Sequence, residues 1–94
     1  MSYRVAPQAA RDLRDALTFL VGENPDAAES LLASFGREFE LLASGIVEGA
    51  QTTLRSGRRV RRWLVHPFWV YYRRTPAGLE ILRVYHHARR PLER

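Results

Sequence analysis

The sequence has no cysteine and no long apolar run, and each of these absences excludes a class of protein. Without cysteine the chain forms neither a disulfide framework nor a thiolate metal site. A chain that needs no disulfide is suited to the reducing cytoplasm. No apolar stretch approaches the ~20 residues that span a membrane, and the first residues lack the apolar core of a secretory signal. These absences predict a soluble, cytoplasmic protein that does not enter a membrane.

Acidic residues are scarce in the second half of the chain, and lysine is absent throughout. Residues 1–48 hold four arginines and eight acids, a net charge of −4, whereas residues 49–94 hold eleven arginines and two glutamates, a net charge of +9. Such a split attracts an anionic partner, either nucleic acid or an acidic protein segment. The alternative is a solvated sheet face that only keeps the protein in solution.

Two helices are predicted in the first half of the chain. Pro7 suits the first turn of the first helix, whose apolar residues then recur at helical spacing. Asn24 is expected to cap a second helix that begins at Pro25 and closes at Gly45. The short connection between them predicts a helical hairpin. With 46% hydrophobic residues there is material for one core, so we expect residues 1–94 to form one domain.

Strand patterns fill most of the rest, after a short first strand that contains Tyr3 and Val5. Residues 46–52 show no periodicity and are expected to form a loop. The predicted strands run from Arg58 to Val65, from Phe68 to Arg73 and from Leu79 to Tyr85. A hairpin turn over residues 75–78 joins the last two. The order β-α-α-β-β-β predicts an α+β fold in which a helical hairpin packs on one face of a small, mainly antiparallel sheet. Both sides of the last strand are partly apolar, so alternation leaves open which side faces the helices.

The other face of the predicted sheet is open to solvent or to a partner. We expect the arginine and aromatic side chains of the C-terminal half to gather there on one accessible surface. Metal binding is poorly supported, because His86 and His87 are adjacent and point to opposite sides of an extended strand. Glu80 and Glu93 are the only acids in the basic half, and no glycine-rich phosphate loop or nucleophile elbow occurs. We therefore expect neither a metal nor a cofactor.

Arginine and histidine are what remain for chemistry. Cleavage of RNA by its own 2′-hydroxyl needs an acid, a base and stabilisation of the charged phosphorane. His86 would serve as acid or base, because histidine ordinarily titrates near neutral pH. Arg83, Arg62 and Arg89 would hold the phosphate, and Tyr72 or Tyr85 would stack on a base. For each residue taken singly, a structural role is the more common one.

An ordered set of short motifs extends over nearly the whole chain. Its members are Pro7, Ala9, Asp12 and Leu13, then Asn24-Pro25, Phe35 and Phe39, then Arg61 to Val65 and Tyr71-Tyr72-Arg73, and finally Ile81 to Val84 with His86 and Arg89. Each piece is weak alone, but together and at this spacing they resemble the RelE/ParE family of toxins from type II toxin–antitoxin systems. The end of the chain resembles the ParE branch more closely, because the terminal aromatic residue of many nuclease members is missing.

The resemblance implies a toxin that is silenced by a cognate antitoxin, in a hetero-oligomeric complex, through an acidic C-terminal antitoxin segment. ParE-like members bind DNA gyrase and have no catalytic residues of their own. The residues expected to contact the target or the antitoxin are Arg61, Trp63, Tyr72, Arg73, Arg89 and Arg90. The alternative is a RelE-like, ribosome-dependent mRNA endonuclease, with His86, Arg83 and Arg62 as catalytic residues. A third hypothesis is a plain nucleic-acid-binding module, motivated by the +9 half alone.

Overall fold

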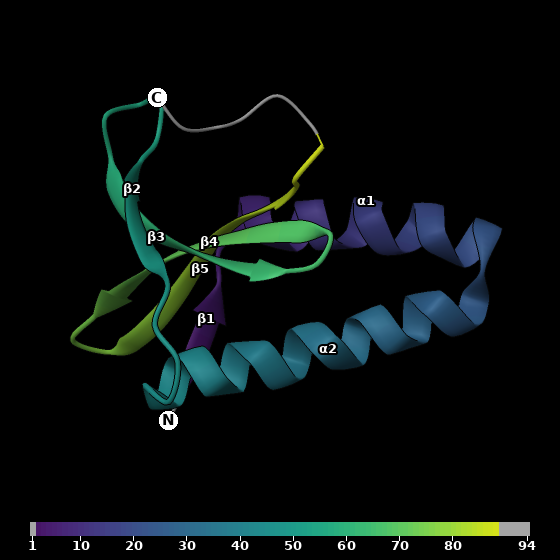
Figure 1. Cartoon of the computed structure of the whole chain (residues 1–94), viewed down its shortest axis with the longest axis horizontal. Coiled ribbons are helices and arrows are strands. Elements are labelled where there is room, and N and C mark those ends of the chain that lie inside the picture. Colours follow the sequence, from purple (N-terminus) through teal and green to yellow (C-terminus); the bar gives the residue numbers. More distant parts are fainter. Residues whose placement is uncertain (1, 89–94) are drawn as a thin grey trace.

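The computed structural model describes residues 2–88 and shows a helical hairpin against one face of a five-stranded sheet (Figure 1). The elements in chain order are β1 (Tyr3–Val5), α1 (Pro7–Glu23), α2 (Pro25–Ser44), β2 (Ala50–Thr53), β3 (Arg59–Val65), β4 (Phe68–Thr75) and β5 (Gly78–His86). The predicted α+β class and the helical hairpin are therefore confirmed.

The second helix, α2, has the capping residues that the sequence predicts at both of its ends. The side chain of Asn24 accepts a hydrogen bond of 3.1 Å from the backbone N–H of Ala27, and Pro25 occupies the first helical position. Gly45 ends α2 in the left-handed conformation, with φ of 82°, which glycine adopts at no steric cost. Within residues 2–88, neither helix is both long and apolar enough to cross a membrane.

The sheet has the order β1-β5-β4-β3-β2, with β1 parallel to β5 and the other neighbours antiparallel. Strand β2 corrects one expectation, because residues 46–52 were predicted to form a loop and Ala50 to Thr53 instead pair with β3. The observed order therefore contains one strand more than predicted, and this strand lies between α2 and the three predicted C-terminal strands. A four-residue edge strand is too short to show an alternating pattern, and its partner supplies the hydrogen bonds that hold it.

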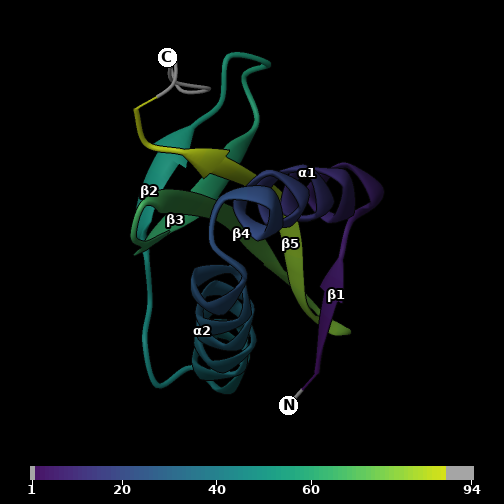
Figure 2. The same ribbon diagram turned by 90° about the vertical axis from the view of Figure 1, so that its right-hand side faces the viewer.

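The main core lies between the helices and the sheet (Figure 2). Phe35, Phe39 and Leu42 of α2 are each at most 3% exposed. The ring of Phe39 lies 5.4 Å from that of Tyr3, and the ring of Phe35 lies 5.7 Å from that of Phe68. These edge-on and tilted aromatic contacts join α2 to strands β1 and β4. The burial of such side chains is the largest favourable contribution to folding.

A β-bulge in β5 decides which side chains face the helices. Tyr71 pairs with Arg83 but Tyr72 pairs with Ile81, so Leu82 has no partner in β4. The extra residue shifts the alternation, and both Ile81 and Val84 pack in the main core. Leu82 packs on the opposite face in a smaller cluster with Val60 and Tyr71. Neither side of β5 that strict alternation would define therefore faces the helices along its whole length.

Candidate functional site

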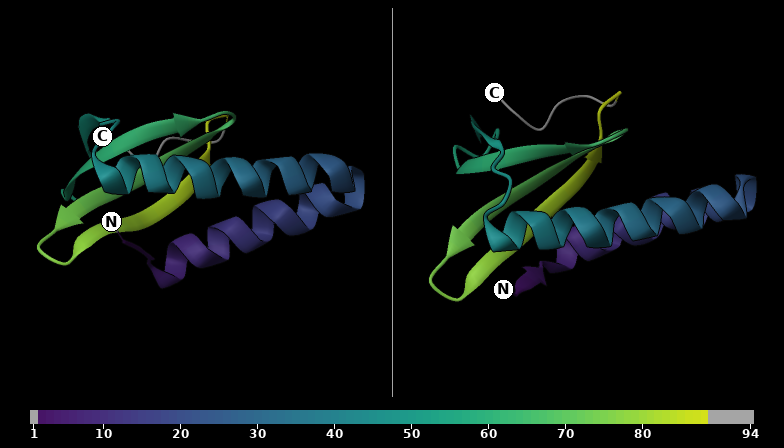
Figure 3. Two further views of the ribbon diagram at one scale, coloured as in Figure 1. Left: turned by 90° about the horizontal axis from the view of Figure 1, so that it is seen from below. Right: turned by 60° about the horizontal axis from the view of Figure 1, so that its bottom comes forward.

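A groove of about 870 Å³ lies between the helical hairpin and one end of the sheet. It exists because the joined ends of α1 and α2 extend past the sheet, as Figure 3 shows, and leave part of their inner face uncovered. Both helices, the β3–β4 turn and the end of β5 line it: Asp12, Asp15, Ala16, Phe19, Leu20, Ala27, Ser30, Leu31, Ser34, His66, Pro67, Phe68, Arg83, Val84, Tyr85 and His86. The interior is mainly apolar, and charged or titratable groups stand at its rim.

Asp12 of α1 joins the helical hairpin to β5 at one wall of the groove. The Nε of Arg83 donates to Asp12 Oδ2 at 2.8 Å, and the second Arg83 nitrogen, Nη2, reaches Oδ1 at 3.3 Å. The backbone N–H of Val84 donates to the same Oδ2 at 3.0 Å. Strand β1 pairs with β5 only as far as Ile81, so the carboxylate satisfies an edge N–H that no strand reaches.

The three histidines lie close together, and two of them, His66 and His86, line the groove. The rings of His66 and His87 lie 5.2 Å apart, and His87 stacks on His86 at the same separation. His86 also meets the ring of Phe68 edge-on at 5.3 Å, and its Nδ1 accepts a hydrogen bond of 3.1 Å from the N–H of Ala88. In the described part of the chain, no group of three or more histidine or acidic side chains is arranged to hold a metal ion.

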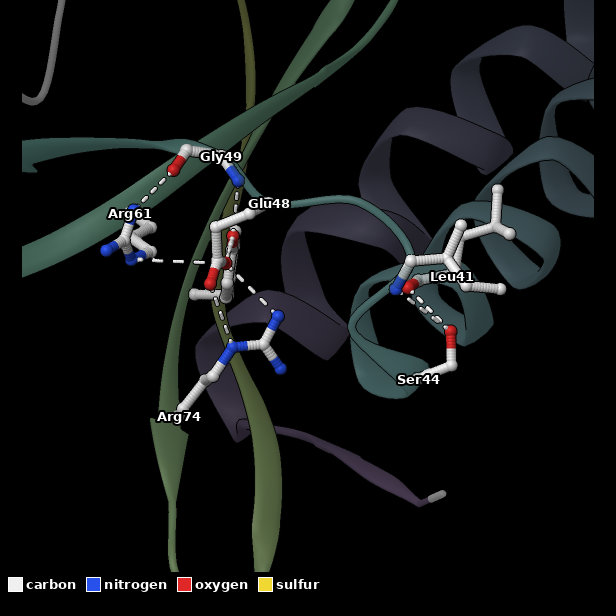
Figure 4. A network of polar contacts seen from close by, with 8 residues as sticks. Leu41, Ser44, Glu48, Gly49, Arg61 and Arg74 are labelled. Atoms are coloured by element: carbon white, nitrogen blue, oxygen red, sulfur yellow. Dashed lines mark hydrogen bonds and ion pairs between the residues drawn. The ribbon is translucent and has the colours of Figure 1, made fainter.

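A second polar cluster closes the connection between α2 and β2, where Glu48 lies between Arg61 and Arg74 (Figure 4). The hydroxyl of Tyr72 donates to Glu48 Oε1 at 2.5 Å and accepts from the N–H of Gly49 at 2.6 Å. Arg74 donates to both carboxylate oxygens, at 3.1 and 3.2 Å, and Arg61 donates to the carbonyl of Gly49 at 2.7 Å. We call these five residues the Glu48 clasp.

The clasp shifts two pKa values in opposite directions. Hydrogen bonds from Arg74, and then from Tyr72, lower the pKa of Glu48 despite partial burial. Burial, followed by the hydrogen bond to Glu48, raises the pKa of Tyr72 to about 12. Tyr72 therefore stays protonated at physiological pH, and its hydroxyl group donates a hydrogen bond to the Glu48 carboxylate.

The three candidate nuclease residues do not converge on one point. Arg83 and His86 line the groove, but Arg83 is held by Asp12. Arg62 lies on the face of the sheet away from the helices, with its guanidinium 4.0 Å from the centre of the Trp69 ring. Alternation along β3 points Arg62 away from the helices, whereas His86 pairs with Phe68, which packs against the main core on the helix side.

The family model for the ParE toxin of type II toxin–antitoxin systems, of the parDE type, matches residues 3–91 of this chain. The chain belongs to this family. Among solved structures, a chain of the one described as "Chromosomal ParDE TA system from P. aeruginosa" is similar in fold, with a TM-score of 0.73. It is 22% identical, and the match covers 92% of the present chain and 95% of the other. None of the curated proteins compared with the chain matches it.

In this ParE-family toxin, the described residues among those expected at a binding surface are found on both sides of the sheet. Tyr72 is fully buried, so it cannot stack on a base or touch a partner. Arg61 is held in the Glu48 clasp, and the indole N–H of Trp63 donates to Glu38 of α2 at 2.9 Å. Arg73 is at the surface on the opposite side and donates to Glu80 at 2.6 Å. Arg89 and Arg90 lie outside the described residues. Of the four described residues, Arg61, Trp63 and Tyr72 lie on the helix side of the sheet and Arg73 on the other, because the side of each strand and the nearest acid direct each side chain.

Sequence reasoning missed the acids that organise the site. Asp12 belongs to the motif carried by the family resemblance, and Glu48 follows α2 in a segment expected to be featureless. Their partners, Arg83 and Arg74, lie 71 and 26 residues further along the chain. The available signal concerned Glu48 alone: it is the last acid before the acid-free segment 49–79, so several arginines are its potential partners.

Replacement of Tyr72 by phenylalanine is expected to lower the free energy of unfolding by about 2 kcal/mol, because the buried Gly49 N–H and the Glu48 carboxylate both lose a partner. Denaturant unfolding of both proteins measures the difference. Tyr3→Phe is the matched control, since no hydrogen bond of its hydroxyl is found within residues 2–88, and we expect a change within about 0.5 kcal/mol. Equal stabilities of the Tyr72 and Tyr3 variants would contradict the role given to the clasp.

The clasp also makes stability depend on pH in the acid range. The pKa of Glu48 is lower in the folded protein than its ordinary value of 4.5, so its contribution is complete above that pH and is lost as the pH falls through the folded pKa. Glu48→Gln should therefore be less stable than the wild type at pH 7, and this difference should shrink as the pH falls below the ordinary pKa of 4.5 and through the lowered pKa of the folded protein. Thermal unfolding at a series of pH values tests this, and a difference that stays constant with pH would exclude ionised Glu48 as the cause.

Proposed function

We propose that this ParE-family toxin inhibits growth by binding DNA gyrase in the cytoplasm, without catalysis of its own, and that a cognate antitoxin neutralises it. The observation that carries the non-enzymatic reading is that Arg83 is bound by Asp12 and that Arg62 lies on the face of the sheet opposite to His86. A general acid or base must lie within hydrogen-bond reach of the reacting group, with its charge-stabilising partners around the same atom. Residues 1–94 act as one domain in this proposal.

The groove is the proposed site of the antitoxin. Its lining is largely apolar, and Phe19 presents a large side chain there that is 72% exposed. An amphipathic helix that lays its apolar face into such a groove is a common mode of protein recognition. The histidines beside the groove, together with Arg73, Arg89 and Arg90, are the proposed contacts to an acidic C-terminal antitoxin segment. The same three arginines are the proposed contacts to gyrase.

Gyrase inhibition is tested with the full chain and purified gyrase. The toxin should inhibit supercoiling and increase the amount of cleaved DNA bound to gyrase, and addition of the adjacently encoded antitoxin should reverse both effects. His86→Ala should retain this activity. The alternative, a ribosome-dependent mRNA endonuclease, predicts instead that transcripts are cut within codons on induction and that His86→Ala abolishes growth inhibition. Cut transcripts with unaffected supercoiling would reject the gyrase proposal.

Docking of the antitoxin in the groove is tested with Phe19→Ala. Truncation of a central aromatic anchor typically costs about 2 kcal/mol, which is roughly a 30-fold weaker dissociation constant. Val21→Ala is the matched control, because Val21 is 53% exposed on the same helix and does not line the groove. Isothermal titration with the antitoxin measures both. If the two substitutions weaken binding equally, the antitoxin does not use this groove.

A further inference from the structure

The β2–β3 hairpin carries a concentration of positive charge of which the Glu48 clasp uses Arg61 alone and the groove uses none. We call residues 50–62 the arginine hairpin; they contain five arginines and no acid. Residues 49–79 as a whole contain seven arginines and neither aspartate nor glutamate. The nearest acid along the chain, Glu48, is already paired with Arg61 and Arg74. The hairpin is therefore strongly positive, with no internal counter-charge.

Three of these arginines stand free of the fold's own ion pairs. Arg55, Arg58 and Arg59 are exposed, and within residues 2–88 none of the three donates to an acid in a direct ion pair. Arg58 acts on Glu80 only at a distance, since the lowered pKa of Glu80 is caused first by its hydrogen bond with Arg73. Because these three side chains are exposed and form no direct ion pair in the described structure, their guanidinium groups are available to a partner.

The shape of the hairpin spreads the three charges around a narrow ribbon. Residues 54–57 form a tight turn, closed by the N–H of Gly57 donating to the carbonyl of Leu54 at 2.8 Å, and Arg55 lies in it. Arg58 and Arg59 are adjacent, so their side chains leave the ribbon on opposite sides. The turn projects from the body of the molecule (Figure 2). The positive charge thus covers the tip and both sides of a two-stranded ribbon.

We propose that the arginine hairpin binds the phosphate backbone of duplex DNA. The major groove of B-DNA admits a two-stranded β-ribbon and presents phosphates on both of its sides, which matches charge on both sides of this ribbon. Guanidinium groups bind phosphates bidentately, and phosphate contacts supply most of the sequence-independent affinity of DNA-binding proteins. The proposal does not rest on gyrase as the target, although DNA contact would add to the hold of the toxin on a gyrase–DNA complex.

Other partners fit the hairpin less well. A protein partner buries apolar and aromatic side chains at the centre of an interface, and none of the large apolar side chains exposed in the described structure belongs to residues 50–62. Single-stranded nucleic acid is held by stacking on aromatic side chains, and residues 50–62 contain no aromatic residue. The deep, narrow major groove of A-form RNA does not admit a ribbon. Polar, strongly positive surfaces are instead typical of DNA interfaces.

The test is fluorescence anisotropy with the full chain and a labelled DNA duplex of 20 base pairs (about two helical turns), in 50–200 mM NaCl. Binding should weaken steeply with salt. The triple substitution Arg55→Gln, Arg58→Gln and Arg59→Gln should weaken binding at least tenfold at 100 mM NaCl and reduce the slope of log affinity against log salt by roughly 2 to 3 units, at about 0.9 per phosphate contact. The control removes the same charge from the exposed faces of the helices with Arg11→Gln, Arg14→Gln and Arg37→Gln, and should change binding less than threefold.

Four results would overturn the proposal. They are no binding of the duplex at 50 mM NaCl, equal losses in the two triple variants, tighter binding of single-stranded RNA of the same length, and equal affinity for a poly-glutamate peptide. The last would assign the hairpin to acidic protein segments. Circular dichroism of each variant verifies that it is folded. Because gyrase and antitoxin are absent from this assay, its outcome is independent of whether the toxin inhibits supercoiling.

Discussion

Asp12→Ala is expected to lower the free energy of unfolding by about 3 kcal/mol, because one carboxylate satisfies two groups that have no alternative. The first is Arg83, whose side chain is 28% exposed and whose partner Asp12 is 11% exposed. Removal of one member of a largely buried pair leaves the other charge without compensation. The second is the N–H of Val84, on the edge of β5 where β1 has ended. Chemical denaturation of the two proteins measures the loss.

The control for this substitution is Asp15→Ala, which removes an exposed acid from the same helix beside the same groove and should change stability by less than about 0.5 kcal/mol. A double-mutant cycle with Arg83→Ala separates the two contributions. If the Val84 N–H matters, Asp12→Ala should remain destabilising by about 1 kcal/mol in the Arg83→Ala background. Full rescue in that background would reduce the role of Asp12 to a simple ion pair.

The sequence-based predictions are accurate where the structural cause lies within a few residues, and they fail where the cause lies in a distant strand. Local causes were visible: Asn24 and Pro25 begin α2, and Gly45 ends it, by interactions with residues three or four positions away. Strand β2 and the bulge at Leu82 have causes in other strands. A register shift cannot be seen in one strand alone, because it exists only relative to a partner.

The same distinction applies to the site. Composition showed that the second half of the chain carries the excess of positive charge. It could not show that Arg83 turns toward α1, that Arg61 and Arg74 enclose Glu48, or that Tyr72 is in the core. Each of these depends on which acid the fold brings near. Arg55, Arg58 and Arg59 instead lie together, exposed and without a direct ion pair within residues 2–88, and this distinguishes the arginine hairpin from the basic segments whose arginines are bound by acids.

Gly49→Ala is expected to destabilise the fold by at least 3 kcal/mol, the upper end of the cost of overpacking a well-packed site. A β-carbon at this position would lie 2.1 Å from the carbonyl oxygen of Arg62 and 3.2 Å from the Tyr72 ring. The obstacle is the backbone of β3, which cannot move without breaking its pairing with β2 or β4. The N–H and carbonyl of Gly49 also bind Tyr72 and Arg61, so any shift that relieves the clash opens the Glu48 clasp as well.

The matched control is Gly36→Ala, where the same added methyl group meets no atom within 4 Å in the middle of α2. Alanine exceeds glycine in helix propensity by roughly 1 kcal/mol, so this substitution should stabilise the protein. The two variants should therefore move the midpoint of thermal unfolding in opposite directions. A Gly49→Ala protein as stable as the wild type would show that the connection between α2 and β2 does not lie against β3 in solution. The clasp, and with it the anchoring of the edge strand that supports the arginine hairpin, would then lose its structural basis.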